Sequence, residues 1–284
     1  MGIEIASALQ DLRACVAQWK REGLRVGFVP TMGNLHAGHY SLVELARSRA
    51  DRVVASVFVN PTQFGPNEDF SRYPRTPEAD AAGLQTAGCD LLWLPSVETM
   101  YPYGADKTVR VQVPGVTDTL EGAHRPGHFD GVATVVARLF NQVDPHVAAF
   151  GRKDYQQLAV IRYLVRDLAF PVDLLAGQTL READGLAMSS RNQYLSADER
   201  PRATEIHRTL QAMREATMQG QARERVEAAA SGRLAAAGFD VDYAVVRAPD
   251  LTLPAREARG PRVALIAARL GRTRLIDNLE FEAD

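Results

Sequence analysis

The sequence predicts an α/β protein with a doubly wound parallel sheet and a second, smaller α+β domain. Continuous apolar runs at 53–59 and 91–94 are typical of strands buried on both faces, as in a parallel sheet. Helix-like segments alternate with such runs over the first two thirds of the chain, which is the pattern of a Rossmann-like fold. The pattern changes near Gly177, so we place the two domains at 1–177 and 178–284.

The first domain is expected to follow the order of its strand-like and helix-like runs. A helical pattern around Leu12 and Trp19 comes first, and a short strand at 26–29 then leads into a helix that carries Leu42 and Val43. Further helices are expected at 77–87, 132–143 and 155–169, and the remaining strands at 53–59, 91–94, 147–151 and 172–175. Segment 109–113 alternates apolar and polar residues, so an edge strand and an excursion from the sheet both stay open.

The second domain begins with two helices and ends with three strands. The helices are expected at 196–217 and 222–237, each with one polar face. Strand-like runs follow at 243–246, 263–267 and 274–277, and glycine-containing turns at 259–261 and 270–272 separate them. Short strands joined by turns favour a small antiparallel sheet, and we interpret this domain as a lid.

Composition excludes several classes of protein. The chain has 284 residues, of which 46% are hydrophobic and 24% charged, and such values are typical of a soluble globular protein. A net charge of -2 argues against a general nucleic-acid binder, and the absence of a leader pattern or a long apolar run argues against a membrane partner. Only Cys15 and Cys89 are present, so no disulfide framework is implied and the reducing cytoplasm is expected.

The segment between the first strand of the sheet and its helix carries the strongest functional signal. It consists of Met32, Gly33, Asn34, Leu35, His36, Ala37, Gly38 and His39. Free N–H groups and the dipole at a helix start favour an anion, and two histidines three residues apart share one helical face. We therefore predict a phosphate clamp in which Gly38 leaves room for a nucleotide. A metal-binding pair and a pair without chemistry stay open as alternatives.

Other polar loops follow the expected strands at the edge where ligands of open α/β sheets bind. Gln63 and Gln157 each offer an amide donor and acceptor, which suit the hydroxyls and carboxylate of a small polar substrate. Lys153 can serve as a counter-charge to phosphate, whereas Asp154 is equally consistent with a helix N-cap.

The loop at 184–192 is another phosphate-binding candidate. Two hydroxyls and a guanidinium in a row, those of Ser189, Ser190 and Arg191, can hold several phosphate oxygens, although the same residues can merely cap a helix. A glycine-rich loop at 121–131 also precedes a helix, and its His124 and Arg125 can face either the site or solvent.

Taken together, these segments resemble the pantothenate synthetase (pantoate–β-alanine ligase) family, within the wider cytidylyltransferase-like group. The resemblance covers essentially the whole chain in order, through the motifs at 30–39, 58–64, 73–76, 125–129, 153–157, 188–192 and 275–278. It implies ATP-dependent condensation of (R)-pantoate with β-alanine through a pantoyl adenylate, with release of AMP and diphosphate. It also implies Mg²⁺ as a companion of ATP and a cytoplasmic homodimer that needs no nucleic acid or membrane.

The resemblance also implies roles for individual residues. His39 is the proton donor, and His36, Lys153, Ser189, Ser190 and Arg191 supply further donors and positive charge. Gln63 and Gln157 hold pantoate, and Gln63 also meets β-alanine. The ATP site comprises Met32, Gly33, Asn34, Leu35, His36, Ala37, Gly38, His39, Gly151, Arg152, Lys153, Asp154, Leu180, Met188, Ser189, Ser190 and Arg191.

The chain departs from the family pattern at one residue, and the resemblance leaves the protein ligands of Mg²⁺ open. The family usually has glutamate where this chain has Arg152, a change that adds positive charge beside the phosphates. Asp80 and Asp154 are candidate protein ligands for Mg²⁺, although we expect phosphates and water to dominate its coordination. A nucleotidyltransferase that keeps AMP on its product and a non-catalytic nucleotide-binding regulator are the alternative functions. A tRNA ligase is disfavoured by the acidic balance.

Overall fold

The computed structural model describes residues 3–66, 68, 70–254 and 259–283. The chain divides into two compact units, a larger one of Met1–Arg152 and Gln157–Gln178 and a smaller one of Lys153–Gln156 and Thr179–Asp284. Segment 153–156, which the sequence places in the first domain, thus groups with the smaller unit. Each unit is described by itself below.

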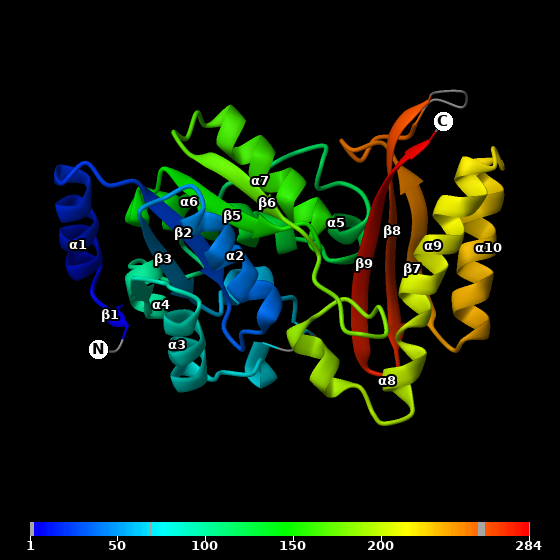
Figure 1. The fold of residues 1–284 in the computed structure, drawn as a ribbon, viewed down its shortest axis with the longest axis horizontal. Coiled ribbons are helices and arrows are strands. Elements are labelled where there is room, and N and C mark those ends of the chain that lie inside the picture. Colours follow the sequence, from blue (N-terminus) through cyan, green and yellow to red (C-terminus); the bar gives the residue numbers. More distant parts are fainter. Residues whose placement is uncertain (1–2, 67, 69, 255–258, 284) are drawn as a thin grey trace. The chain divides into compact units, whose positions relative to one another are not determined.

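A six-stranded parallel sheet forms the centre of the larger unit (Figure 1). In spatial order its strands are β1 Glu4–Ala6, β4 Leu91–Trp93, β3 Arg52–Val57, β2 Val26–Thr31, β5 Val147–Gly151 and β6 Asp173–Gly177. The chain moves outward from β2 to β3 and β4, then returns to place β5 and β6 on the other side of β2. The predicted doubly wound sheet is therefore confirmed, and its topological switch point lies between β2 and β5.

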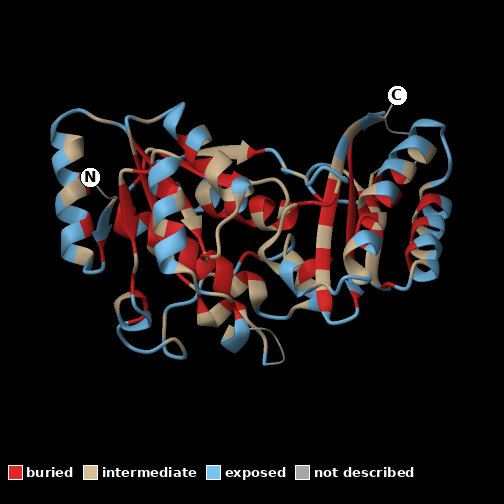
Figure 2. Ribbon diagram, turned by 60° about the horizontal axis from the view of Figure 1, so that its bottom comes forward, coloured by how far each residue is buried: buried red, intermediate tan, exposed pale blue. Residues whose placement is uncertain are grey.

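Helices cover both faces of this sheet because successive strand residues point to opposite sides. In β2, Phe28 packs with α6 and Val29 packs with α2. One face carries α1 Leu9–Arg21, α6 His128–Val143 and α7 Tyr155–Asp167, and the other carries α2 Ala37–Arg47 and α3 Pro77–Thr86. Figure 2 shows burial concentrated on the central strands, and helices such as α1, α2 and α3 have exposed outer sides, whereas α6 is buried over most of its length.

Segment 109–113 belongs to no strand of the single chain. The prediction of an edge strand is therefore wrong for the single chain, and the segment is an excursion from the sheet. The backbone N–H of Val111 donates to the Thr134 hydroxyl of α6 at 2.9 Å, instead of to a neighbouring strand. Val113 is buried, but Val109 is 79% exposed. The alternating valines therefore do not share one packed side, because their burial rises from the exposed Val109 to the buried Val113.

Several short elements of the larger unit lie in segments that periodicity does not mark. They are η1 Pro61–Gln63, η2 Phe70–Arg72, α4 Val97–Met100 and α5 Glu121–His124. The strand β1 has only three residues, too few for an alternating pattern, and it pairs in parallel with β4.

The smaller unit has the α+β architecture that the sequence predicts. Its antiparallel sheet has the order β7 Asp240–Arg247, β8 Gly260–Leu270 and β9 Thr273–Ala283. The helices α9 Glu205–Met218 and α10 Arg223–Ala236 lie side by side on this sheet (Figure 1). Leu210 and Leu234 from these helices pack with Ile266 of β8 in the core of the unit.

The helix expected at 196–217 is interrupted. A single turn, α8 Glu199–Arg202, precedes α9. Pro201 has no backbone N–H and therefore fits only the first turn of a helix. The Thr204 hydroxyl donates to the Pro201 carbonyl at 2.7 Å, which satisfies an acceptor where the two helices separate.

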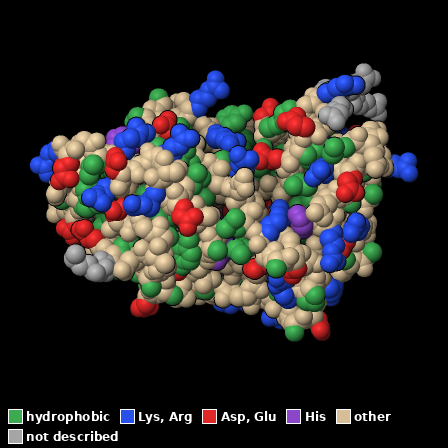
Figure 3. All heavy atoms as spheres, in the orientation of Figure 1, with side chains coloured by type: hydrophobic (Ala, Val, Ile, Leu, Met, Phe, Trp, Pro, Cys, Tyr) green, Lys and Arg blue, Asp and Glu red, His purple; other side chains and the backbone are tan. Residues whose placement is uncertain are grey.

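The surface carries both signs of charge. Figure 3 shows Lys and Arg side chains and Asp and Glu side chains spread over the face in view, in keeping with 33 basic and 35 acidic residues in the sequence. None of the helices in the described ranges combines the length and apolar composition that a membrane crossing requires.

Candidate functional site

The turn between β2 and α2 adopts an unusual backbone. Gly33 has φ of 83° and Asn34 has φ of 51°, so two consecutive residues lie in the left-handed region. Glycine and asparagine are the residues that tolerate this region best. The buried carboxylate of Asp80, from α3, accepts the N–H of Asn34 at 2.9 Å and that of Leu35 at 2.8 Å. Asp80 therefore fixes the turn that leads to the two histidines.

The histidines of this turn form a reciprocal cap at the start of α2. Nδ1 of His36 accepts the N–H of Gly38 at 3.1 Å, and Nδ1 of His39 accepts the N–H of His36 at 3.3 Å. A ring nitrogen that accepts a hydrogen bond carries no proton, so the neutral rings both carry it on Nε2. The ring centroids are 4.2 Å apart. The cap thus produces two neighbouring Nε2–H donors at a helix N-terminus, an arrangement suited to phosphate oxygens.

Gly38 is required by this cap. A Cβ atom at this position would lie 2.9 Å from Cε1 of His36, closer than side chains pack. The expectation that Gly38 makes room for a nucleotide stays a prediction, and the imidazole of His36 is the nearer reason for the glycine.

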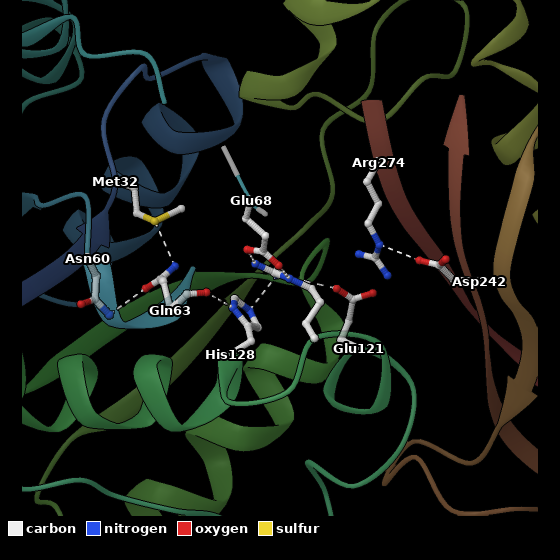
Figure 4. Close-up of polar contacts among 9 residues, drawn as sticks. Met32, Asn60, Gln63, Glu68, Glu121, His128, Asp242 and Arg274 are labelled. Carbon is white, nitrogen blue, oxygen red and sulfur yellow. Dashed lines mark hydrogen bonds and ion pairs between the residues drawn. The ribbon is translucent and has the colours of Figure 1, made fainter. Parts of the chain in front are cut away.

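Segment 60–63, which follows β3, forms a buried amide network (Figure 4). Nδ2 of Asn60 donates to Oε1 of Gln63 at 3.1 Å and to the carbonyl of Gly131 at 3.1 Å. Its Oδ1 accepts the Tyr101 hydroxyl at 2.6 Å. Nε2 of Gln63 donates to Sδ of Met32 at 3.0 Å, so the structure brings these two predicted site residues together.

Asn60, which the sequence did not single out, directly contacts the predicted site residue Gln63. It is 1% exposed and every polar atom of its amide is engaged. Its place in the loop that follows β3, within the motif at 58–64, is the signal that could have found it.

A chain of contacts leads from Glu68 to the backbone of Gln63 (Figure 4). The Arg125 guanidinium makes a two-pronged contact with the Glu68 carboxylate at 2.7 and 2.6 Å, and its Nη1 lies 3.0 Å from Nε2 of His128. Arginine only donates, so Nε2 of His128 accepts and Nδ1 carries the proton. Nδ1 then donates to the carbonyl of Gln63 at 2.8 Å. Arg125, whose placement the sequence left open, thus belongs to the surroundings of Gln63.

His128 is held neutral by its environment. Burial, reinforced by the neighbouring Arg125 charge, lowers the pKa of His128 to about 4. At neutral pH it can therefore orient the Gln63 carbonyl without bringing a charge to the site.

Gln157, the other amide expected to hold substrate, lies in the first turn of α7 and is half-buried. Within the described residues no hydrogen bond joins it to Gln63, and the binding of pantoate by these two amides stays a prediction.

The predicted phosphate residues of the smaller unit lie in two segments. The carbonyl of Lys153 accepts Nδ2 of Asn278 at 2.8 Å, and Nζ of Lys153 lies 3.8 Å from the Asp154 carboxylate. Met188 donates its N–H to the carbonyl of Leu180 at 2.9 Å, which brings together two further residues expected at ATP.

The cap function that the sequence left open for the serines is present at Ser189. Its hydroxyl accepts the N–H of Arg191 at 3.3 Å, and it caps η3 Ser190–Tyr194. Capping one N–H leaves the hydroxyl with further hydrogen-bonding capacity, so this local role and phosphate binding are compatible.

The fold and the histidine-capped turn first define a class. The chain is a doubly wound α/β protein with an anion-suited helix start at the switch point of its sheet. Residues 4–280 match the family described as pantoate-beta-alanine ligase. The chain therefore belongs to the pantoate–β-alanine ligase family.

Individual relatives agree with this assignment. A protein of Stenotrophomonas maltophilia (strain K279a) named pantothenate synthetase is 68% identical over 98% of this chain and 100% of its own length. The crystal structure of pantothenate synthetase from Thermus thermophilus is similar with a TM-score of 0.91 and 51% identity, covering 98% of this chain and 99% of that one. The crystal structure of pantoate-beta-alanine ligase from Francisella tularensis, complexed with Beta-gamma ATP and Beta-alanine, is similar with a TM-score of 0.82 and 32% identity. The match covers 98% of this chain and 97% of that one.

Proposed function

We propose that this chain condenses pantoate with β-alanine to pantothenate at the expense of ATP. The observation that carries the proposal is the full-length match to relatives named pantothenate synthetase, joined to an intact histidine cap after β2. The complex of the Francisella relative with an ATP species and β-alanine supports the same two substrates.

The reaction that we propose has two steps. The pantoate carboxylate attacks the α-phosphorus of ATP, which forms pantoyl adenylate and expels diphosphate. The β-alanine amine then attacks the acyl carbon, forms the amide bond and releases AMP. The first step needs stabilisation of phosphate charge more than it needs a protein nucleophile.

The residues proposed for this chemistry are hydrogen-bond donors and cations. His39 is the proposed proton donor, and the Nε2–H tautomer that its cap contact imposes supports this role. His36, Lys153, Ser189, Ser190 and Arg191 are proposed to stabilise the phosphates, together with the backbone of 32–39 and 151–154 and with Leu180 and Met188. Gln63 and Gln157 are proposed to bind pantoate, and Gln63 also β-alanine.

Mg²⁺ is proposed to be bound mainly by the phosphates of ATP. Asp80, one of the two candidate protein ligands, already accepts hydrogen bonds from Asn34, Leu35 and the Thr76 hydroxyl. Across the part of the chain that the structure describes, no group of three or more His, Cys, Asp or Glu side chains could hold a metal ion. When bound, Mg²⁺ would offset phosphate charge, and these residues fit an ion coordinated by phosphate and water rather than by a protein cage.

A homodimer in the cytoplasm is the proposed state of the protein. The alternating segment 109–113 supports the homodimer, because Val109 is exposed and the same segment of a second copy could pair with it across a two-fold axis. Both cysteines are free thiols, which supports the reducing compartment.

Isotope exchange between diphosphate and ATP tests the proposed order of chemistry. We expect labelled diphosphate to enter ATP when pantoate and Mg²⁺ are present, without β-alanine, because the first step is complete and reversible before the amine arrives. Exchange that needs β-alanine would indicate a concerted route. Accumulation of an adenylylated product that β-alanine does not consume would favour a nucleotidyltransferase, and neither exchange nor product would favour a regulator.

A further inference from the structure

Two adjacent residues of β9, Asp277 and Asn278, are buried polar side chains to which the proposed reaction assigns no role. They are 5% and 6% exposed, and they belong to the motif at 275–278. We propose that Asp277 and Asn278 are positioning residues that hold Lys153 and the 181–191 segment in one fixed arrangement for phosphate binding. This inference rests on the proposed function, since it assumes that both segments bind the phosphates of ATP.

Asp277 holds the start of the 181–191 segment. Its carboxylate receives both prongs of the Arg181 guanidinium, at 2.6 and 3.0 Å. Two parallel charge-assisted hydrogen bonds fix orientation as well as distance. Nη1 of Arg181 also donates to the carbonyl of Gly185 at 3.1 Å, so the same guanidinium spans the loop that follows it.

The segment between Arg181 and Met188 is a small hairpin, so fixing its first residue also fixes its end. Arg181 and Ala187 form an antiparallel bridge, and Glu182 donates its N–H to the carbonyl of Leu186 at 2.8 Å. Ser189, Ser190 and Arg191 follow this hairpin directly in the chain. The position of three proposed phosphate donors therefore depends on the contact between Arg181 and Asp277.

Asn278 holds Lys153 in the same way. Its N–H donates to Oδ1 of Asp277 at 2.8 Å, which couples the two neighbours, and its Nδ2 donates to the carbonyl of Lys153 at 2.8 Å. A second contact secures this segment, since the Tyr155 hydroxyl donates to the carbonyl of Pro249 at 3.1 Å. These contacts explain why Lys153–Gln156 group with the smaller unit although the chain on either side belongs to the larger one.

The consequence is that Lys153 and the donors of 189–191 move as one body. Positioning is what phosphoryl chemistry needs most, because a misplacement of about 1 Å can cost roughly 10²-fold in rate. A merely structural role for Asp277 and Asn278 would instead lower stability and slow both half-reactions alike.

Two conservative variants test the proposal. Asn278→Asp keeps the size of the side chain but replaces the donor to Lys153 with a carboxylate oxygen. Arg181→Lys keeps the charge but loses the two-pronged contact. Arg274→Lys is the matched control, because Arg274 makes a similarly sheltered ion pair, to Asp242 of β7 at 2.6 Å, that involves neither segment (Figure 4).

Three measurements on the full-length protein distinguish the roles: diphosphate–ATP exchange with pantoate, pantothenate formation from supplied pantoyl adenylate and β-alanine, and the thermal unfolding midpoint. We expect Asn278→Asp and Arg181→Lys to slow exchange by about 10- to 100-fold. Their use of supplied adenylate should stay within about two-fold of the parent, because the diphosphate has already left. Arg274→Lys should keep the parent's exchange rate.

Equal losses in both half-reactions, an unchanged exchange rate in both variants, or an equal effect of Arg274→Lys would each overturn the inference. If one variant does not fold, the other still tests the inference. The quantity compared is the ratio of its exchange rate to its rate of pantothenate formation from supplied adenylate. Absence of both exchange and pantothenate formation in the parent protein would refute the proposed function instead.

Discussion

At the scale of single residues, the histidine cap shows how one side chain can serve structure and chemistry together. Nδ1 of each ring accepts a backbone N–H of the α2 start, and this contact itself sets the proton on Nε2. The local fold therefore prepares the donor that the proposed reaction uses. The two roles can be separated because an asparagine oxygen can replace Nδ1 but not Nε2–H.

Substitutions at His39 separate the two roles. We expect both His39→Asn and His39→Ala to slow diphosphate–ATP exchange by about 10²–10³-fold, the usual cost of losing such a donor. Only His39→Ala also loses the cap acceptor, so it alone should lower the free energy of unfolding, by about 1 kcal/mol. Denaturant unfolding and exchange rates measure the two effects. Near-parental exchange in His39→Asn would contradict the role of Nε2.

His128 makes the stability of the protein depend on pH. Its pKa is about 4 in the folded chain and near its ordinary value when unfolded, so the unfolded state binds more protons between these pH values. The contribution of neutral His128 is fully present above about pH 6.5 and is lost as the pH falls towards 4. His128→Asn keeps a donor for the Gln63 carbonyl but cannot titrate.

We therefore expect the parent to lose more stability than His128→Asn when the pH is lowered from about 7 to about 4.5. The expected difference is about 2 kcal/mol in the free energy of unfolding, from the displacement of the His128 pKa. Urea unfolding of both proteins at the two pH values measures it. Parallel losses would show that other groups dominate the acid response.

At the scale of elements, α3 holds the turn from which α2 begins. Asp80 binds the backbone of a turn whose residues Gly33 and Asn34 are both left-handed, and it does so from a helix more than forty residues further along the chain. The turn is a strained segment that its neighbour stabilises, as is common where a backbone shapes a ligand site.

Replacing Asp80 with asparagine should loosen this turn. One of the two N–H donors would face an amide group instead of an oxygen, at a cost of about 1–3 kcal/mol in the free energy of unfolding. ATP affinity, measured by titration calorimetry, should fall as well. Thr76→Val is the control, because it removes a single hydroxyl donor to Asp80 and leaves the turn contacts in place. Parental stability of Asp80→Asn would show that the turn holds its shape unaided.

Elements with strong periodicity were predictable, and contacts between distant segments were not. The buried strands β2, β3 and β5 could be predicted from their apolar runs. The strand β1 could not, because its three residues are too few to show a pattern. The histidines and Gln63 are predicted as site residues because they lie in loops that follow strands, and their roles stay predictions. The positions of His128 and Asn278 depend on partners 65 and 125 residues away, which no local pattern encodes.

At the scale of the whole molecule, the proposed dimer depends on segment 109–113. The exposed Val109 is the residue whose substitution should prevent pairing, because each copy would bring a charge to the two-fold axis. We expect the parent to sediment as a dimer and Val109→Lys as a monomer in analytical ultracentrifugation. Tyr163→Lys, at another exposed apolar residue, should leave the dimer intact. Identical sedimentation of Val109→Lys and the parent would place the interface elsewhere.

The contact between Asn278 and the Lys153 carbonyl also has a consequence for synthesis of the chain, because its two residues are made at different times. Translation releases Lys153 first and Asn278, the side chain that holds its carbonyl, 125 residues later. A nascent chain that has completed β6 already contains the histidine cap and Gln63, but it lacks the strand on which Lys153 rests. Under the proposed function, a partly made chain that lacks β9 should therefore form adenylate more slowly than the complete chain.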